Sequence, residues 1–198
     1  MKMVLRWTMA ILVLIWANGA FAMPIVYTAQ LDGASEDPAN ASPATGFAEI
    51  DFDIVAHFLT VNLTFSDLLG TTTASHIHSP TALPGIGTAG VATELPSFAG
   101  FPFGVTSGSY MHTFDMTLTS TWNPAFITAN GGTPGSAEAA LDASLAAGTA
   151  YLNIHTSVVP SGEIRGFLAP ASVPEPSTLF LMGTGLAGVG ILRRRFRR

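Results

Sequence analysis

Three histidines carry the clearest chemistry in this sequence. His76 and His78 stand two residues apart, so on a β-strand both side chains project from the same face. His155 lies at the end of a second strand-like segment. Imidazole nitrogen is a preferred ligand of zinc and copper, and this spacing suits a metal site on a sheet. His76, His78 and His155 are therefore candidate ligands of a divalent metal.

A predicted hairpin adds a carboxylate to this set. Residues 151–155 and 162–166 alternate in polarity and pair as antiparallel strands. If the turn centres near Val159, His155 faces Glu163 across the hairpin. Glu163 is then the candidate fourth ligand, or a hydrogen-bond acceptor behind the histidines.

The same register places Asn153 opposite Arg165. Arg165 is the only formal cation between residues 23 and 170, where twelve acidic residues bring the net charge to −11. A single arginine in so acidic a domain is typical of a structural network, which we assign to Asn153 and Arg165. The negative charge also excludes nucleic acid and anionic lipid as partners of the domain.

Two interpretations of the histidines stay open. The sequence favours histidines that hydrogen-bond across strands without metal, and the alternative is a copper or zinc site. The chain has no cysteine, which excludes disulfides and thiolate ligands. It also lacks a nucleophile elbow, a phosphate-binding loop and a dinucleotide fingerprint. We therefore favour a non-catalytic module, with a metalloenzyme, redox in kind, as the alternative.

Alternating apolar and polar residues predict an all-β domain. Residues 48–54 and 59–65 alternate strictly and predict two strands joined as a hairpin. Further strands are predicted at 25–31, 74–78, 90–95, 110–118, 149–156 and 162–168, and one short helix at 136–147. Seven to eight short antiparallel strands are typical of a sandwich or barrel.

The N-terminus has the layout of a secretory signal peptide. Two basic residues precede an apolar stretch, and small residues follow, with Ala20 and Ala22 at the positions that signal peptidase reads. Cleavage after Ala22 leaves one domain over residues 23–170.

The C-terminus, residues 171–198, has three parts after a short linker. They are Pro174, Glu175 and Pro176, then the uncharged segment 177–192, then a cluster that includes Arg193, Arg194 and Arg195. The arginines favour the cytoplasmic side, which places the domain outside. A helix over the apolar segment reaches about 24 Å, short of a hydrocarbon core of about 30 Å. We therefore predict a short transmembrane helix that serves as a transient processing signal.

This three-part tail resembles the PEP-CTERM sorting signal of Gram-negative bacteria. The resemblance implies recognition by an exosortase-type peptidase, cleavage near the Pro-Glu-Pro triplet, and transfer from an inner-membrane intermediate to the outer envelope or the medium. It also implies a bacterium that makes exopolysaccharide and a biofilm matrix.

A second resemblance covers residues 27 to 168. The segments SHIH at 75–78, YLNIHT at 151–156 and GEIRG at 162–166 resemble the signature segments of the CHRD domain. The resemblance implies an immunoglobulin-like all-β fold without established enzymatic activity. The expected function is thus that of an exported envelope or matrix module, with a polysaccharide or a protein as its ligand.

Overall fold

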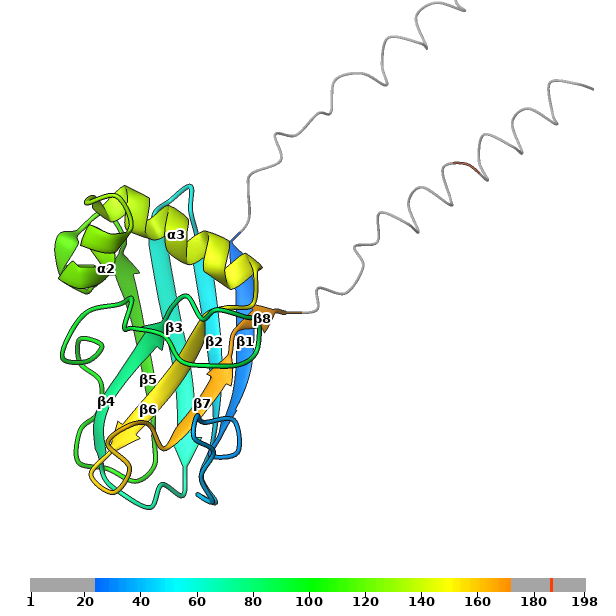
Figure 1. Ribbon diagram of the computed structural model, residues 1–198, viewed down its shortest axis with the longest axis vertical. Coiled ribbons are helices and arrows are strands. Elements are labelled where there is room, and N and C mark those ends of the chain that lie inside the picture. The colour runs from blue at the N-terminus through cyan, green and yellow to red at the C-terminus, as the bar shows by residue number, and fades with distance from the viewer. Residues whose placement is uncertain (1–23, 172–185, 187–198) are drawn as a thin grey trace, which may run out of the picture.

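The structure is a computed structural model that describes residues 24–171 and Leu186 (Figure 1). Within these residues no helix is both long and apolar enough to cross a membrane. Several predictions lie outside the described residues. They are the signal peptide at 1–22 with Ala20 and Ala22, the triplet at 174–176, the membrane segment at 177–192 apart from Leu186, and the arginines at 193–195.

Eight antiparallel strands form one continuous sheet, which curves into a half-barrel (Figure 1). The strands are β1 (Ile25–Asp32), β2 (Thr45–Asp53), β3 (Phe58–Ser66), β4 (Thr72–His78), β5 (Gly108–Asp115), β6 (Tyr151–Thr156), β7 (Ile164–Phe167) and β8 (Ala169–Pro170). Their order across the sheet is β4-β6-β7-β1-β2-β3-β5, and β8 pairs with β1. The all-β class is confirmed, as a single curved sheet.

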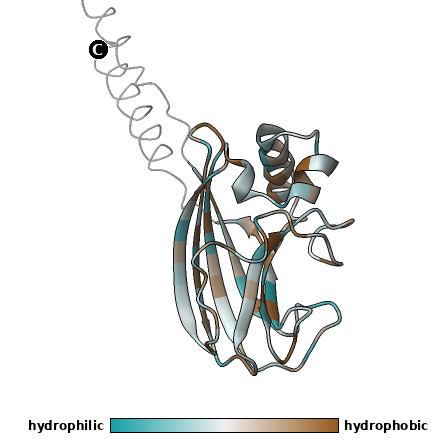
Figure 2. Ribbon diagram, turned by 90° about the vertical axis from the view of Figure 1, so that its left-hand side faces the viewer, coloured by the Kyte–Doolittle hydropathy of each residue, from teal (hydrophilic) through white to brown (hydrophobic). Residues whose placement is uncertain are grey.

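The core lies on the inner face of this sheet. In the predicted hairpin, β2 and β3 pair along their whole length, with Ile50 opposite Val61 and Phe52 opposite Leu59. All four side chains are buried, and each contributes roughly 1.5–3 kcal/mol of hydrophobic stabilisation. Apolar and polar residues alternate along the strands in Figure 2, as a half-buried sheet requires.

Two helices lie at one end of the half-barrel (Figures 1 and 2). The predicted helix is α3 (Pro134–Ala146), which begins at a capping box between Thr133 and Ser136. Its side chains Leu141 and Leu145 are buried in the core. A shorter helix, α2 (Pro124–Ala129), precedes it and was not predicted, because its six residues are too few for a helical period. A 3₁₀ turn, η2 (Thr119–Thr121), leads into it.

Two predicted strands differ from the structure in ways that shape the site. Residues 90–95 form isolated bridges, His78 with Val91 and Thr93 with Trp122, in a loop that covers β4. The last strand was predicted to begin at Gly162 but begins at Ile164. Gly162 has a φ of +132°, a backbone conformation that glycine tolerates and other residues avoid.

Candidate metal centre

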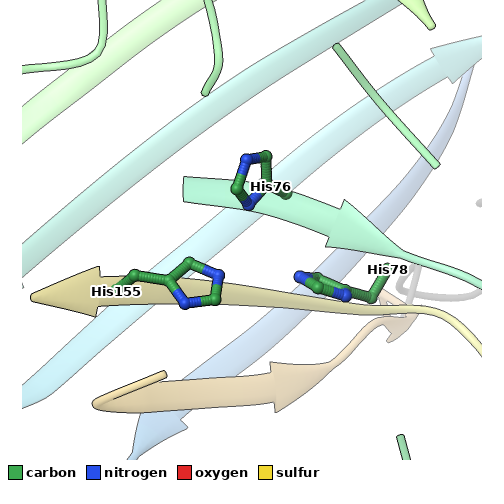
Figure 3. Close-up of side chains that lie close together, drawn as sticks. All are labelled: His76, His78 and His155. Carbon is green, nitrogen blue, oxygen red and sulfur yellow. The ribbon is translucent and has the colours of Figure 1, made fainter. Parts of the chain in front are cut away.

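The three histidines meet on one face of neighbouring strands β4 and β6 (Figure 3). The ring centroids of His76 and His155 are 5.3 Å apart, and those of His76 and His78 are 5.7 Å apart. Each residue brings one ring nitrogen within 4.8 Å of those of the other two. A metal with bonds of about 2.0–2.1 Å to all three nitrogens therefore requires the rings to move somewhat closer together.

Strand alternation places this group on the face away from the core. Ile77 on β4 and Leu152 and Ile154 on β6 are fully buried in the hydrophobic core, so their neighbours in sequence point the opposite way. Loops cover that outer face, and their backbone carbonyls hydrogen-bond to the ring nitrogens. His76 and His78 are consequently buried although they lie outside the core.

Backbone carbonyls fix the protonation of all three rings. Nε2 of His76 lies 2.7 Å from the Pro96 oxygen, Nδ1 of His78 lies 2.9 Å from the Ala89 oxygen, and Nδ1 of His155 lies 2.9 Å from the Pro160 oxygen. A carbonyl can only accept a hydrogen bond, so each of these nitrogens carries the proton. The second nitrogen of each neutral ring therefore presents a lone pair.

Those second nitrogens have no hydrogen-bond partner. Nδ1 of His76, Nε2 of His78 and Nε2 of His155 are shielded from solvent and unpaired among the described residues. A buried polar atom without a hydrogen bond lowers the stability of the folded state, and three such atoms lie together here. Ligand rings that donate their other nitrogen to a carbonyl are the usual support of metal-binding histidines.

Burial also keeps the rings neutral. Loss of solvent lowers the pKa of His76 and of His78 to about 4 and lowers the pKa of His155 as well. The carbonyl hydrogen bonds oppose this effect without cancelling it. At neutral pH the site therefore offers unprotonated imidazoles, which is the form that binds a metal.

Glu163 does not join the three histidines, which corrects its assignment as fourth ligand. Its carboxylate accepts hydrogen bonds from Thr156 Oγ1 at 2.6 Å, from Ser42 Oγ at 2.7 Å, and from the backbone of Leu69 and Gly70 at 2.6 and 3.2 Å. Strand alternation does not fix its direction, because β7 begins one residue later. Glu163 is fully buried and joins the loops that hold Ser42 and Leu69 to the end of β6.

The predicted register of Asn153 opposite Arg165 is confirmed. Arg165 is 3% exposed, and its guanidinium donates to the carbonyl oxygens of Ser35 and Gly87. It also lies 3.8 Å from the Glu36 carboxylate and packs over two aromatic rings, that of Tyr151 at 4.8 Å and that of Phe167 at 5.5 Å.

Sequence reasoning missed Tyr151, whose ring stacks on His78. Strand alternation alone would have found it, since Tyr151 lies two residues before Asn153 and four before His155 on the same face of β6.

The remaining domain histidines lie elsewhere. His57, in the turn between β2 and β3, is half-exposed and bonds Glu138 on α3 at 2.8 Å. His112 shares a strand face with the buried Tyr110 and Phe114 but is itself exposed, on a strand at the edge of the half-barrel. Neither belongs to the cluster, so both serve as controls for it.

Family models match both the domain and the C-terminal segment of the chain. Residues 27–168 match the family model of the CHRD domain, and residues 172–198 match that of the PEP-CTERM protein-sorting motif. The sorting motif indicates an exported protein that an exosortase handles and that ends at the cell surface or outside the cell. No curated protein and no solved structure matched the chain.

Proposed function

The chain belongs to the CHRD domain family, and we propose that its domain is an exported, non-catalytic module that binds a copper or zinc ion through His76, His78 and His155. One observation carries the proposal. Each ring has one nitrogen held by a backbone carbonyl, and the other nitrogen is buried and unpaired beside its counterparts. The metal-free alternative accounts for the nitrogens held by carbonyls but leaves the second nitrogen of each ring unpaired.

The donor set indicates the class of metal. Three neutral imidazoles without a thiolate suit copper(II) or zinc, and for a given nitrogen site copper(II) generally binds more tightly than zinc. Alkaline-earth ions prefer oxygen ligands and are excluded. The enclosure of the three nitrogens supports a binding role over catalysis, because a catalytic metal needs an open coordination position.

Metal analysis of the full-length protein tests this proposal. The protein is purified without a polyhistidine tag, loaded with copper(II) or zinc, dialysed and analysed by elemental mass spectrometry. We expect one equivalent of metal, and its loss in the double variant His76→Ala/His78→Ala. The control His112→Gln, which changes an exposed histidine outside the cluster, retains the metal. Absence of stoichiometric metal from the wild type would contradict the proposal.

We further propose that both ends of the chain are removed during export. Signal peptidase cuts after Ala22, and an exosortase-type peptidase cuts near Pro174, Glu175 and Pro176, after the apolar segment has held the protein in the inner membrane. The matched sorting motif supports the second cut. The mature module then carries no apolar tail and acts in the outer envelope or the extracellular matrix.

Intact-mass measurement in the producing bacterium tests the processing. We expect the secreted protein to begin at Met23 and to lack the segment 177–198. The triple variant Pro174→Ala/Glu175→Ala/Pro176→Ala provides the matched control, since it removes the triplet and is expected to stay uncut in the membrane fraction. Recovery of wild-type protein that still ends at Arg198, with an active exosortase present, would contradict the proposal.

A further inference from the structure

Asn153 lies beside the histidine cluster and carries an unpaired polar atom of its own. It is 2% exposed, and its Oδ1 is shielded from solvent without a hydrogen-bond partner. Asn153 belongs to β6, the strand that carries His155 and that pairs with the strand of His76 and His78.

Strand register puts the Asn153 side chain among the three rings. Asn153 pairs directly with His76 across β4 and β6, and it lies between Tyr151 and His155 on one face of β6. The ring of His78 lies 4.9 Å from that of Tyr151 and 5.9 Å from that of His155. The side chains of His78 and Asn153 are also in contact.

The position of the Asn153 amide nitrogen is given by its distance from Gly162. A Cβ placed on Gly162 would lie 2.9 Å from Nδ2 of Asn153 and 2.6 Å from Oε1 of Glu36. The amide nitrogen thus points toward Gly162, on the side of the Glu36 carboxylate. Because the oxygen and nitrogen of a carboxamide diverge, Oδ1 points away from that side, and the contact of the Asn153 side chain with His78 places the amide against the histidine rings.

From this arrangement we infer that Oδ1 of Asn153 is the fourth donor to the metal, an inference that rests on the proposed three-histidine site. Three imidazole nitrogens and one neutral oxygen complete a four-coordinate shell, the number that a closed site prefers. The oxygen takes the position that the sequence had assigned to Glu163. The bound metal would satisfy all four orphaned atoms at once.

A neutral donor set leaves the charge of the bound ion uncompensated. With three imidazoles and an amide, the bound ion keeps its full double positive charge in a buried place. The Glu36 carboxylate, which lies on the Gly162 side of Asn153, is shared with Arg165. The site therefore favours an ion that gains most from imidazole nitrogen, and adding a negative charge at position 153 should tighten binding.

Cobalt(II), a coloured substitute for zinc, tests the inference on the full-length protein. The absorption of cobalt(II) is strong in a four-coordinate shell and weak in a five- or six-coordinate one. We expect a strong band in the wild type. In Asn153→Leu, which keeps the branched outline of the side chain and removes the oxygen, water replaces the amide oxygen, the band shifts, and affinity falls about tenfold to a hundredfold.

Asn153→Asp guards against a variant that fails to fold, because it keeps the size and the oxygen. We expect it to bind cobalt(II) at least about tenfold more tightly than the wild type. Ser75→Ala is the matched control, since Ser75 donates to the backbone oxygen of Asn153 at 2.8 Å without being a donor to the metal. It should lower stability while leaving the cobalt(II) spectrum unchanged.

The outcomes separate this inference from the proposed function. A wild type that binds no metal contradicts the three-histidine site itself. A wild type that binds metal, with affinity and spectrum unchanged in both Asn153→Leu and Asn153→Asp, leaves that site intact and overturns the role of Asn153. If only Asn153→Asp folds, an unchanged affinity in that variant overturns it equally.

Discussion

The imidazole of His78 stacks on the phenol ring of Tyr151, with centroids 4.9 Å apart and planes 6° from parallel. The Tyr151 hydroxyl accepts a hydrogen bond from the Ala89 nitrogen at 3.3 Å, and the Ala89 oxygen is the partner of His78 Nδ1. Arg165 lies against the same phenol ring. Tyr151 therefore positions His78 in two ways. Its ring stacks on the imidazole, and its hydroxyl holds the loop whose Ala89 carbonyl binds Nδ1 of His78.

Removal of the Tyr151 ring should weaken metal binding without touching a donor atom. In Tyr151→Leu, His78 loses its stacked neighbour and Ala89 loses its acceptor, so we expect metal affinity to fall about tenfold. Tyr151→Phe keeps the ring but also removes the acceptor of Ala89, so its affinity should lie between those of Tyr151→Leu and the wild type. Isothermal titration of the metal-free proteins with zinc measures both. Equal affinities in Tyr151→Leu and the wild type would show that stacking does not position His78.

Loss of the buried arginine should destabilise the domain. In Arg165→Met, the carbonyls of Ser35 and Gly87 lose their donor and Glu36 loses its ion pair, so we expect the free energy of unfolding to fall by about 2–4 kcal/mol. Arg165→Lys should recover little, because an ammonium cannot reproduce the planar fork of donors. Urea denaturation of both variants, with the slope m compared to exclude a change in cooperativity, measures the effect.

Strand alternation accounts for what the sequence predicted well. The β2–β3 hairpin, the pairing of Asn153 with Arg165, and the clustering of three histidines all follow from a period of two residues, because that period is a local property. The curvature of the single sheet and its strand order depend on contacts distant in sequence, which alternation does not encode.

The Glu163 assignment shows where local reasoning failed. Alternation fixes a side chain's direction only inside a strand, and Gly162, at φ +132°, turns the chain just before β7 begins. The donors that hold Glu163 come from distant segments, with Leu69 94 positions away and Ser42 121 positions away. The carbonyl partners of the histidines lie in loops whose paths no short sequence pattern specifies.

A neutral replacement of Glu163 should cost stability and leave metal binding intact. Burial acts to raise the pKa of Glu163, but its hydrogen bonds outweigh that effect and hold the pKa below the usual value. In Glu163→Gln an amide N–H meets donors in place of an acceptor, so we expect a loss of about 2–4 kcal/mol in the free energy of unfolding.

The same variant discriminates between the two roles considered for Glu163. Measured by zinc titration under conditions where Glu163→Gln is folded, the affinity should equal that of the wild type. A large drop in affinity without a loss of stability would return Glu163 to the metal site.

Glu36 should make stability depend on pH. Burial raises the pKa of its carboxyl to about 7, and Arg165 opposes the shift. The folded state therefore holds a proton that the unfolded state, with its pKa of 4.5, releases earlier. The stabilisation is complete below the unfolded value and is lost as the pH rises through about 7.

Glu36→Gln isolates this contribution, because glutamine stays neutral at every pH. We expect the variant to gain stability over the wild type progressively from about pH 5 to about pH 8, by about 2–3 kcal/mol in total. Urea unfolding of the metal-free proteins across this range measures the difference, in which the histidine titrations cancel. A difference that stays constant with pH would mean that Glu36 ionises normally in the folded protein.

The contact between β7 and β1 depends on a glycine. A Cβ on Gly166 would lie 2.2 Å from the backbone oxygen of Gln30, and rotation of a side chain cannot relieve an overlap with backbone. In Gly166→Ala the two strands must separate next to the pair Asp32 and Arg165, so we expect a loss of about 2–3 kcal/mol in the free energy of unfolding.

Gly90→Ala is the matched control, because nothing lies within 4 Å of its added Cβ, and its effect should stay within about 0.5 kcal/mol. Since Arg165 packs against Tyr151, Gly166→Ala should also lower zinc affinity, whereas a loss of stability with unchanged affinity would show that the metal centre is insulated from the β1–β7 contact.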